Sequence, residues 1–84
     1  MIDFFWNDWN RQKIDAHYLT VEEVEFAWRG RRDLKRGTHP IHGDYTESVG
    51  RIPSGRLITI VWRYNEDYEG ERVVFVITAY GGGK

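Results

Sequence analysis

The chain has 84 residues, with 12 lysines and arginines, 13 aspartates and glutamates, and a net charge of −1. This length is typical of one domain, and the balanced charge excludes a polybasic, histone-like protein. No cysteine is present, which excludes disulfides, thiolate catalysis and cysteine-based metal sites. Aromatic residues make up 15% of the chain, so that even a short sequence can bury a large apolar area.

The N-terminal third carries the signals of two helices. The first is predicted to begin at Asn7 or Asp8 and to run to about His17. The second follows Thr20, which forms a capping box with Glu23, and it is expected to stop at Gly30. Its apolar residues recur at helical spacing and predict one buried stripe. This stripe consists of Val21, Val24, Ala27 and Trp28.

Beyond residue 31 the hydrophobic pattern has the period of two that is typical of strands. Residues 45–52 alternate like a half-exposed strand, whereas 56–64 and 72–80 are apolar on both faces and are expected to be central. A short first strand within residues 31–42 stays open, although Gly37 and Pro40 oppose it. The sequence therefore predicts an α+β fold, in which two N-terminal helices pack on one face of a three- to four-stranded antiparallel sheet.

The organisation of the chain predicts one domain over residues 1–80 and a flexible glycine tail over residues 81–84. The longest apolar run, residues 73–77, has the length of a strand and not the roughly 18 residues of a membrane span. The first residues lack the basic region of a signal peptide. We therefore expect a cytoplasmic protein with no membrane partner.

Two runs of opposite charge explain the near-neutral total. The basic run after the second helix has a net charge of +4 and consists of Arg29, Arg31, Arg32, Lys35 and Arg36, opposed by Asp33. It either contacts phosphates of a nucleic acid or complements the dipole at the helix C-terminus. The acidic run Glu66, Asp67, Glu69 and Glu71 is expected to be a solvated hairpin tip. This separation of charge leaves RNA open as a partner.

The histidines and the strand arginines are the candidates for chemistry. His39 and His42 have no third ligand nearby, so we predict no metal site and no cofactor. His17 is either a capping residue or a general acid or base. The strand arginines are either surface residues or a clamp that stabilises a phosphorane transition state. Arg56 and Arg63 should point to opposite faces of their strand, because side chains alternate.

Several short motifs follow one another in a distinctive order. Phe5-Trp6-Asn7 is followed by Asn10, Lys13 and His17, then by Thr20-Val21-Glu22-Glu23-Val24, then by Gly50-Arg51 with Ser54-Gly55-Arg56, and finally by Val76-Ile77-Thr78-Ala79. In this order they resemble the BrnT toxin family over about residues 2–80. The resemblance implies a RelE-like fold. It also implies a bacterial type II toxin, a metal-independent endoribonuclease that inhibits translation and is neutralised by a co-encoded antitoxin protein.

The resemblance and the basic run together imply partners and site residues. RNA and the antitoxin are the expected partners, in either a homodimer or a toxin–antitoxin hetero-oligomer. Catalysis is assigned to Arg56, Arg63 and His17. Contacts to RNA are assigned to Lys13, Arg29, Arg31, Arg32, Arg51 and Tyr80.

Two alternatives remain beside the toxin hypothesis. Phe75 and Tyr80 stand where the family usually has arginines, which favours a catalytically inactive interaction module that binds a protein partner. The basic run alone favours a protein that binds nucleic acid without cleaving it.

Overall fold

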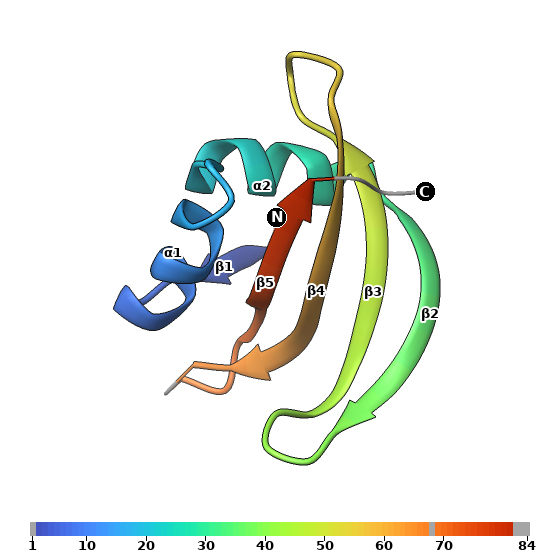
Figure 1. Cartoon of the computed structure of the whole chain (residues 1–84). Coiled ribbons are helices and arrows are strands. Elements are labelled where there is room, and N and C mark those ends of the chain that lie inside the picture. Colours follow the sequence, from blue (N-terminus) through green and yellow to red (C-terminus); the bar gives the residue numbers. More distant parts are fainter. Residues whose placement is uncertain (1, 68, 82–84) are drawn as a thin grey trace.

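Five strands and two short helices make up the fold, which the computed structural model describes over residues 2–67 and 69–81. In chain order the elements are β1 (Asp3–Phe5), α1 (Asp8–Asp15), α2 (Val21–Arg29), β2 (Arg32–His39), β3 (Gly43–Arg51), β4 (Leu57–Glu66) and β5 (Arg72–Gly81). The strands form one sheet in the order β1-β5-β4-β3-β2 (Figure 1). β1 is parallel to β5, and the other neighbours are antiparallel.

The predicted RelE-like antiparallel sheet of three to four strands is therefore wrong, because the sheet has five strands and is mixed. β1 has three residues, which is too short for an alternating pattern to be recognised. β2 forms in spite of Gly37, since it lies at the edge of the sheet and pairs only with β3. The ring of Tyr45 lies directly over Gly37 and occupies the space where a side chain would stand. Pro40 lies beyond the strand, in the turn.

Both predicted helices are confirmed, together with their caps. Asn7 and Asn10 form a capping box at α1, which ends two residues before the predicted His17. Thr20 and Glu23 form the predicted box at α2, and Gly30 follows the last helical residue. These signals are reliable because each box satisfies backbone N–H groups within one turn of chain.

The core lies between α2 and one face of the sheet, which we call the helix face. α2 approaches β3 closely, because Gly50 has no side chain and the carbonyl of Ala27 occupies the adjacent space. α1 lies beside β5 and adds Ile14 to the core (Figure 1). The buried cluster comprises Ile14, Leu19, Val24, Ala27, Trp28, Ile52, Ile58, Ile60, Trp62, Val74, Val76 and Ala79. The opposite face of the sheet is called the open face below.

The two strands expected to be central are confirmed as β4 and β5. β5 extends to Gly81, one residue past the predicted domain boundary, and the rest of the predicted glycine tail lies outside the described residues. Within the part of the chain that the structure describes, neither helix is long and apolar enough to cross a membrane.

Candidate functional site

The open face presents a row of side chains on β5 that points away from the core. Tyr80, Thr78 and Phe75 pair with Thr59, Val61 and Arg63 of β4. These β4 residues alternate with Ile58, Ile60 and Trp62, whose side chains are buried on the helix face. The register shifts between Val61 and Trp62, so that Thr78 and Phe75 share a face although they are three residues apart. This row forms one wall of the candidate site.

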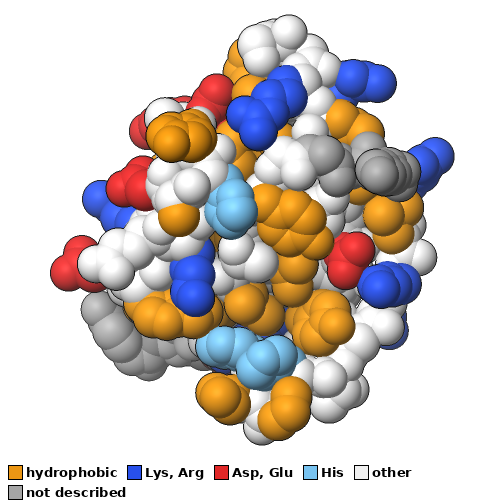
Figure 2. Space-filling view, in the orientation of Figure 1, with side chains coloured by type: hydrophobic (Ala, Val, Ile, Leu, Met, Phe, Trp, Pro, Cys, Tyr) orange, Lys and Arg blue, Asp and Glu red, His pale blue; other side chains and the backbone are white. Residues whose placement is uncertain are grey.

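A groove of about 330 Å³ crosses the open face beside α1. Its lining comes from α1, the β2–β3 turn and the three central strands, and consists of Trp9, Lys13, His39, His42, Tyr45, Glu47, Val61, Ile77 and Thr78. Figure 2 shows this face, where histidine side chains gather at two places with hydrophobic and basic side chains between them. Segments distant in sequence therefore meet at one surface.

Trp9 lies at the end of the groove that is next to the β2–β3 turn, where it contacts Phe75 and His42. Its ring stacks on Phe75, with centroids 6.0 Å apart and planes 8° apart, and its centroid lies 5.0 Å from that of the His42 ring. The ammonium nitrogen of Lys13 lies 5.2 Å from the centre of the indole. Because Trp9 is still 38% exposed, an aromatic surface remains accessible next to an imidazole and a cation.

The electrostatics of this end favour an uncharged imidazole at His42. Desolvation lowers the pKa of His42 below its usual value, and the positive charges of His39, Arg63 and Lys13 lower it further. At neutral pH the ring is therefore unprotonated and can accept a proton. Arg63 lies with its guanidinium 5.1 Å from the ring centre of Phe75, and its buried Nε has no hydrogen-bond partner among the described residues.

His39 is oriented by the turn between β2 and β3. Its Nδ1 accepts hydrogen bonds from the backbone N–H groups of Ile41 and His42, at 3.0 and 3.2 Å. A neutral His39 ring therefore carries its hydrogen on Nε2. The rings of His39 and His42 lie 4.8 Å apart, and no group of three or more potential metal ligands occurs among the described residues.

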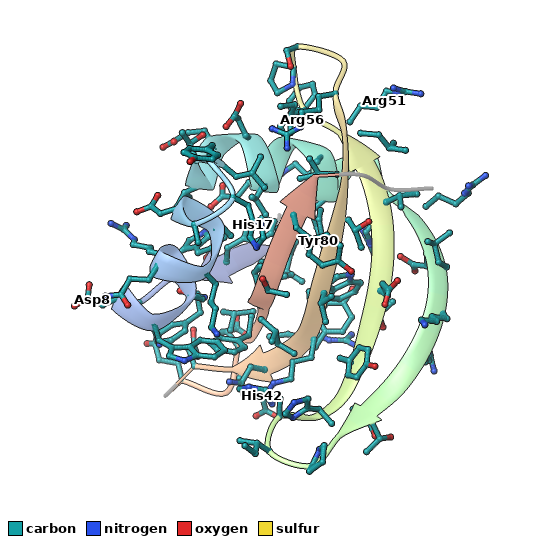
Figure 3. The ribbon with its side chains drawn as sticks, viewed as in Figure 1. Asp8, His17, His42, Arg51, Arg56 and Tyr80 are labelled. Carbon is teal, nitrogen blue, oxygen red and sulfur yellow. The ribbon has the colours of Figure 1, made fainter. Side chains whose placement is uncertain are left out.

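His17 and Tyr80 form the second part of the open-face site. Their ring centroids lie 6.0 Å apart (Figure 3). Tyr80 is two residues from Thr78, which lines the groove, so that the pair lies about 7 Å further along β5. Of the residues that the sequence suggested, Lys13, His17, Arg63 and Tyr80 are thus brought to one face.

Arg51 and Arg56 lie elsewhere, at the loop between β3 and β4 (Figure 3). Arg51 donates a hydrogen bond of 2.7 Å to the carbonyl oxygen of Gly55 within that loop. The guanidinium of Arg56 rests against Gly81, at the end of β5. Seven residues separate Arg56 from Arg63, which is about 23 Å along an extended strand. One phosphate therefore cannot contact both arginines.

The basic run after α2 does not form one continuous surface. Arg29 pairs with Glu25 at 3.8 Å, and Lys35 pairs with Glu47 at 3.9 Å. Arg32 is exposed at the start of β2, opposite Val49. The remaining two arginines of the run, Arg31 and Arg36, line a groove on the helix face. The run is thus divided between the two faces of the sheet.

Arg31 has a structural role in the fold. Its guanidinium lies 3.8 Å from the ring centre of Trp28 and 4.7 Å from that of Trp62. Its Nε is 3.0 Å from Asp33 Oδ1, and its Nη1 donates to the carbonyl oxygen of Trp28. These contacts neutralise the charge and close the end of the core.

Sequence reasoning missed three residues of the groove. Trp9 was expected only as part of a helix, His42 only as a poor metal ligand, and Glu47 only as part of a half-exposed strand. The available signal was the two-histidine turn, since a hairpin turn at the end of a sheet can meet a neighbouring helix. Comparison with protein-family models, with curated proteins and with solved structures finds no match for this chain.

Proposed function

We propose that the chain is the toxin of a bacterial type II toxin–antitoxin pair and cleaves RNA in the cytoplasm without a metal ion. One observation carries this proposal: the neutral His42, the cation Lys13 and the exposed Trp9 line one groove, and the guanidinium of Arg63 lies over Phe75, the ring on which Trp9 stacks. These groups match the needs of a single-stranded RNA substrate. The order of the BrnT-like motifs supports the assignment to a toxin.

Recognition of RNA follows from the chemistry of the groove. Bases of single-stranded RNA stack on exposed aromatic rings, and Trp9 offers such a ring. Lys13 and Arg63 supply positive charge next to it, where a phosphate between two nucleotides would lie. Glu47 and Tyr45 add polar groups at the opposite wall, where they can bind a ribose hydroxyl or a base edge.

The proposed cleavage uses the 2′-hydroxyl of the RNA as the nucleophile. The 2′-oxygen forms a bond to phosphorus while the bond from phosphorus to the 5′-oxygen breaks, which gives a 2′,3′-cyclic phosphate and a 5′-hydroxyl end. His42 accepts the 2′-hydroxyl proton, because its lowered pKa keeps it unprotonated at neutral pH. Lys13 and Arg63 offset the charge of the phosphorane. Water supplies the proton to the 5′-oxygen, because His17 lies beside Tyr80, five residues along β5 from the Phe75 under Trp9 and about 16 Å away.

The test compares the wild type with two groove variants and one matched control. Lys13→Gln and His42→Asn are expected to slow cleavage of a single-stranded RNA by about 100-fold or more, since each removes a group that acts in the transition state. Arg11→Gln changes an exposed cation on the same helix, outside the groove, and should stay within about twofold of wild type. Cleavage is followed by gel electrophoresis in EDTA, and cyclic phosphate ends by mass spectrometry.

Two outcomes would contradict the nuclease proposal: intact RNA with the wild-type protein, or equal rates for Lys13→Gln and Arg11→Gln. Expression in bacteria adds a second readout. Growth should stop with the wild type, continue with His42→Asn, and recover when the product of the neighbouring antitoxin gene is expressed with it.

One observation favours the alternative of a non-catalytic interaction module. Phe75, at a position where BrnT strands usually carry an arginine, is only 8% exposed and is packed under Trp9. An apolar ring there supplies no charge to a phosphate. This alternative predicts a tight protein partner without RNA cleavage, and a pull-down that recovers no partner would count against it.

A further inference from the structure

The helix face holds a second groove, of about 680 Å³, on the part of β2, β3 and β4 that α2 leaves uncovered. Arg36, Thr46 and Trp62 lie in one row across these strands. Because Trp62 belongs to the core, the whole row points to the helix face. Figure 1 shows both helices on the side of β1 and β5, whereas β2 and β3 curve away from them.

Two arginines give this groove its free positive charge. Arg36 and Arg72 are exposed and have no carboxylate within 4.0 Å among the described residues. The guanidinium of Arg72 lies 3.7 Å from the ring centre of Tyr64, which holds it at the wall of the groove. The lining contains four arginines and two aspartates, so that its net charge is +2 at neutral pH.

The groove borders a strand with an unpaired edge. β2 is the last strand of the sheet, and seven of its eight residues are exposed. Its pairing with β3 shifts register between Asp33 and Lys35, so that a regular ladder of hydrogen bonds remains over residues 35–39, which include Arg36. The outer backbone groups of such an edge can pair with an added strand.

We propose that this surface binds an extended acidic segment of a partner protein. The segment adds a strand outside residues 35–39 of β2, and its carboxylates enter the groove and bind Arg36 and Arg72. Opposite charges on paired strands stabilise the pairing, whereas like charges destabilise it. The site shares only Tyr45 with the lining of the open-face groove, and the proposal holds whether or not the chain cleaves RNA.

The structure disfavours a second copy of the chain as the occupant. β2 carries Arg32, Lys35 and Arg36 against Asp33, so that pairing between two copies would bring two positive strands together. The acidic run of the chain, Glu66, Asp67, Glu69 and Glu71, lies at the closed β4–β5 hairpin, where the carboxylate of Asp67 accepts hydrogen bonds from two backbone N–H groups. That turn cannot act as an extended strand.

RNA also fits this groove less well than a peptide does. Trp62 is buried, and the guanidinium of Arg72 covers one face of Tyr64, which leaves little aromatic surface for a base. An unpaired strand edge matches a polypeptide backbone and offers nothing specific to a nucleic acid.

The experiment uses a fluorescein-labelled ten-residue peptide of alternating threonine and glutamate, titrated with the whole protein and followed by fluorescence anisotropy. A threonine–lysine peptide of the same length is the charge control. The acidic peptide should bind at least about tenfold more tightly than the lysine peptide. Arg36→Glu and Arg72→Glu should each weaken its binding about tenfold, because each removes a charge-assisted hydrogen bond, whereas Arg11→Glu should not.

NMR amide shifts should map the bound peptide to residues 35–39, and Arg36→Gln serves as the second variant if Arg36→Glu fails to fold. The proposal is overturned if the two peptides bind equally, if the groove variants bind like wild type, or if the amide shifts map to the open face. It is also overturned if a ten-nucleotide RNA displaces the peptide from the wild type and the Arg36→Glu variant binds this RNA more weakly. A dimer that is seen by light scattering and that Arg36→Glu dissociates would overturn it as well.

Discussion

Replacement of Ser48 by alanine removes one buried oxygen atom from the fold. It tests how much the hydrogen bonds of this hydroxyl stabilise the core beneath the second groove. Ser48 is 0% exposed. Its Oγ donates a hydrogen bond of 2.6 Å to Asp33 Oδ1 and accepts one of 2.9 Å from Trp62 Nε1. The same carboxylate oxygen of Asp33 binds Arg31, so that one buried hydroxyl connects β4, β3 and β2.

The expected cost of Ser48→Ala follows from these two bonds. A buried indole N–H that loses its acceptor costs about 1–3 kcal/mol. The bond to Asp33 adds less, about 1 kcal/mol or below, because the side chain of Asp33 is 54% exposed and water can replace the hydroxyl. The total is about 1–4 kcal/mol of unfolding free energy. In a domain of this size that corresponds to a fall in Tm of roughly 4–32 °C.

Thermal and urea unfolding followed by circular dichroism measure this loss. Ser54→Ala, in the exposed β3–β4 loop, is the matched control and should change stability by less than about 0.5 kcal/mol. In a Trp62→Phe background the donor is absent, so that Ser48→Ala should cost at least about 1 kcal/mol less than in wild type. An equal cost in both backgrounds would refute the hydrogen-bond explanation.

The fold and the groove each yield a further prediction. Gly50→Ala should destabilise the protein by about 1–3 kcal/mol in urea, because the new methyl group meets the carbonyl of Ala27; Gly30→Ala, with no atom within 4 Å of its added methyl group, should cost far less. His42 should titrate by NMR below its usual pKa of 6.5, and Lys13→Gln should raise the midpoint only in part, since desolvation is the largest cause. Because the unfolded chain then takes up the His42 proton first, stability should fall as the pH drops below 6.5, and His42→Asn should reduce that fall.

The parts of the fold that the sequence predicted are those encoded within one turn of chain. The capping boxes of Asn7 and Thr20 each involve residues three positions apart, so that both helices could be recognised without their surroundings. The parallel pairing of β1 with residues 73–75 joins segments about 70 positions apart, and nothing within three residues encodes it. Mixed topology was therefore beyond the reach of local patterns.

In the candidate site, too, features set by neighbouring residues could be predicted from the sequence, whereas contacts between distant segments could not. The pairing of Arg63 with Phe75 on the open face follows from the period of two within β4, which is a local property. Arg56 precedes β4, which begins at Leu57, so that alternation does not place it. The meeting of Trp9 with His42 depends on where the end of a hairpin meets a helix more than thirty residues away in sequence. That contact decides which histidine lies among the cations of the groove, and it moved the proposed base from His17 to His42.

Alternation also places most of the lining of the two grooves on opposite faces of the sheet. Thr46 and Glu47 are neighbours on β3, yet Thr46 lines the groove of the helix face and Glu47 that of the open face. Tyr45 lines both grooves, and Arg63 lines that of the helix face, so that the sheet separates the two ligands everywhere except around these two side chains. Lys13→Gln should slow RNA cleavage by about 100-fold or more and leave binding of the acidic peptide unchanged. Arg36→Glu should weaken peptide binding and leave cleavage within about twofold of wild type. Loss of both activities in a folded Arg36→Glu protein would show that RNA extends around the edge at β2.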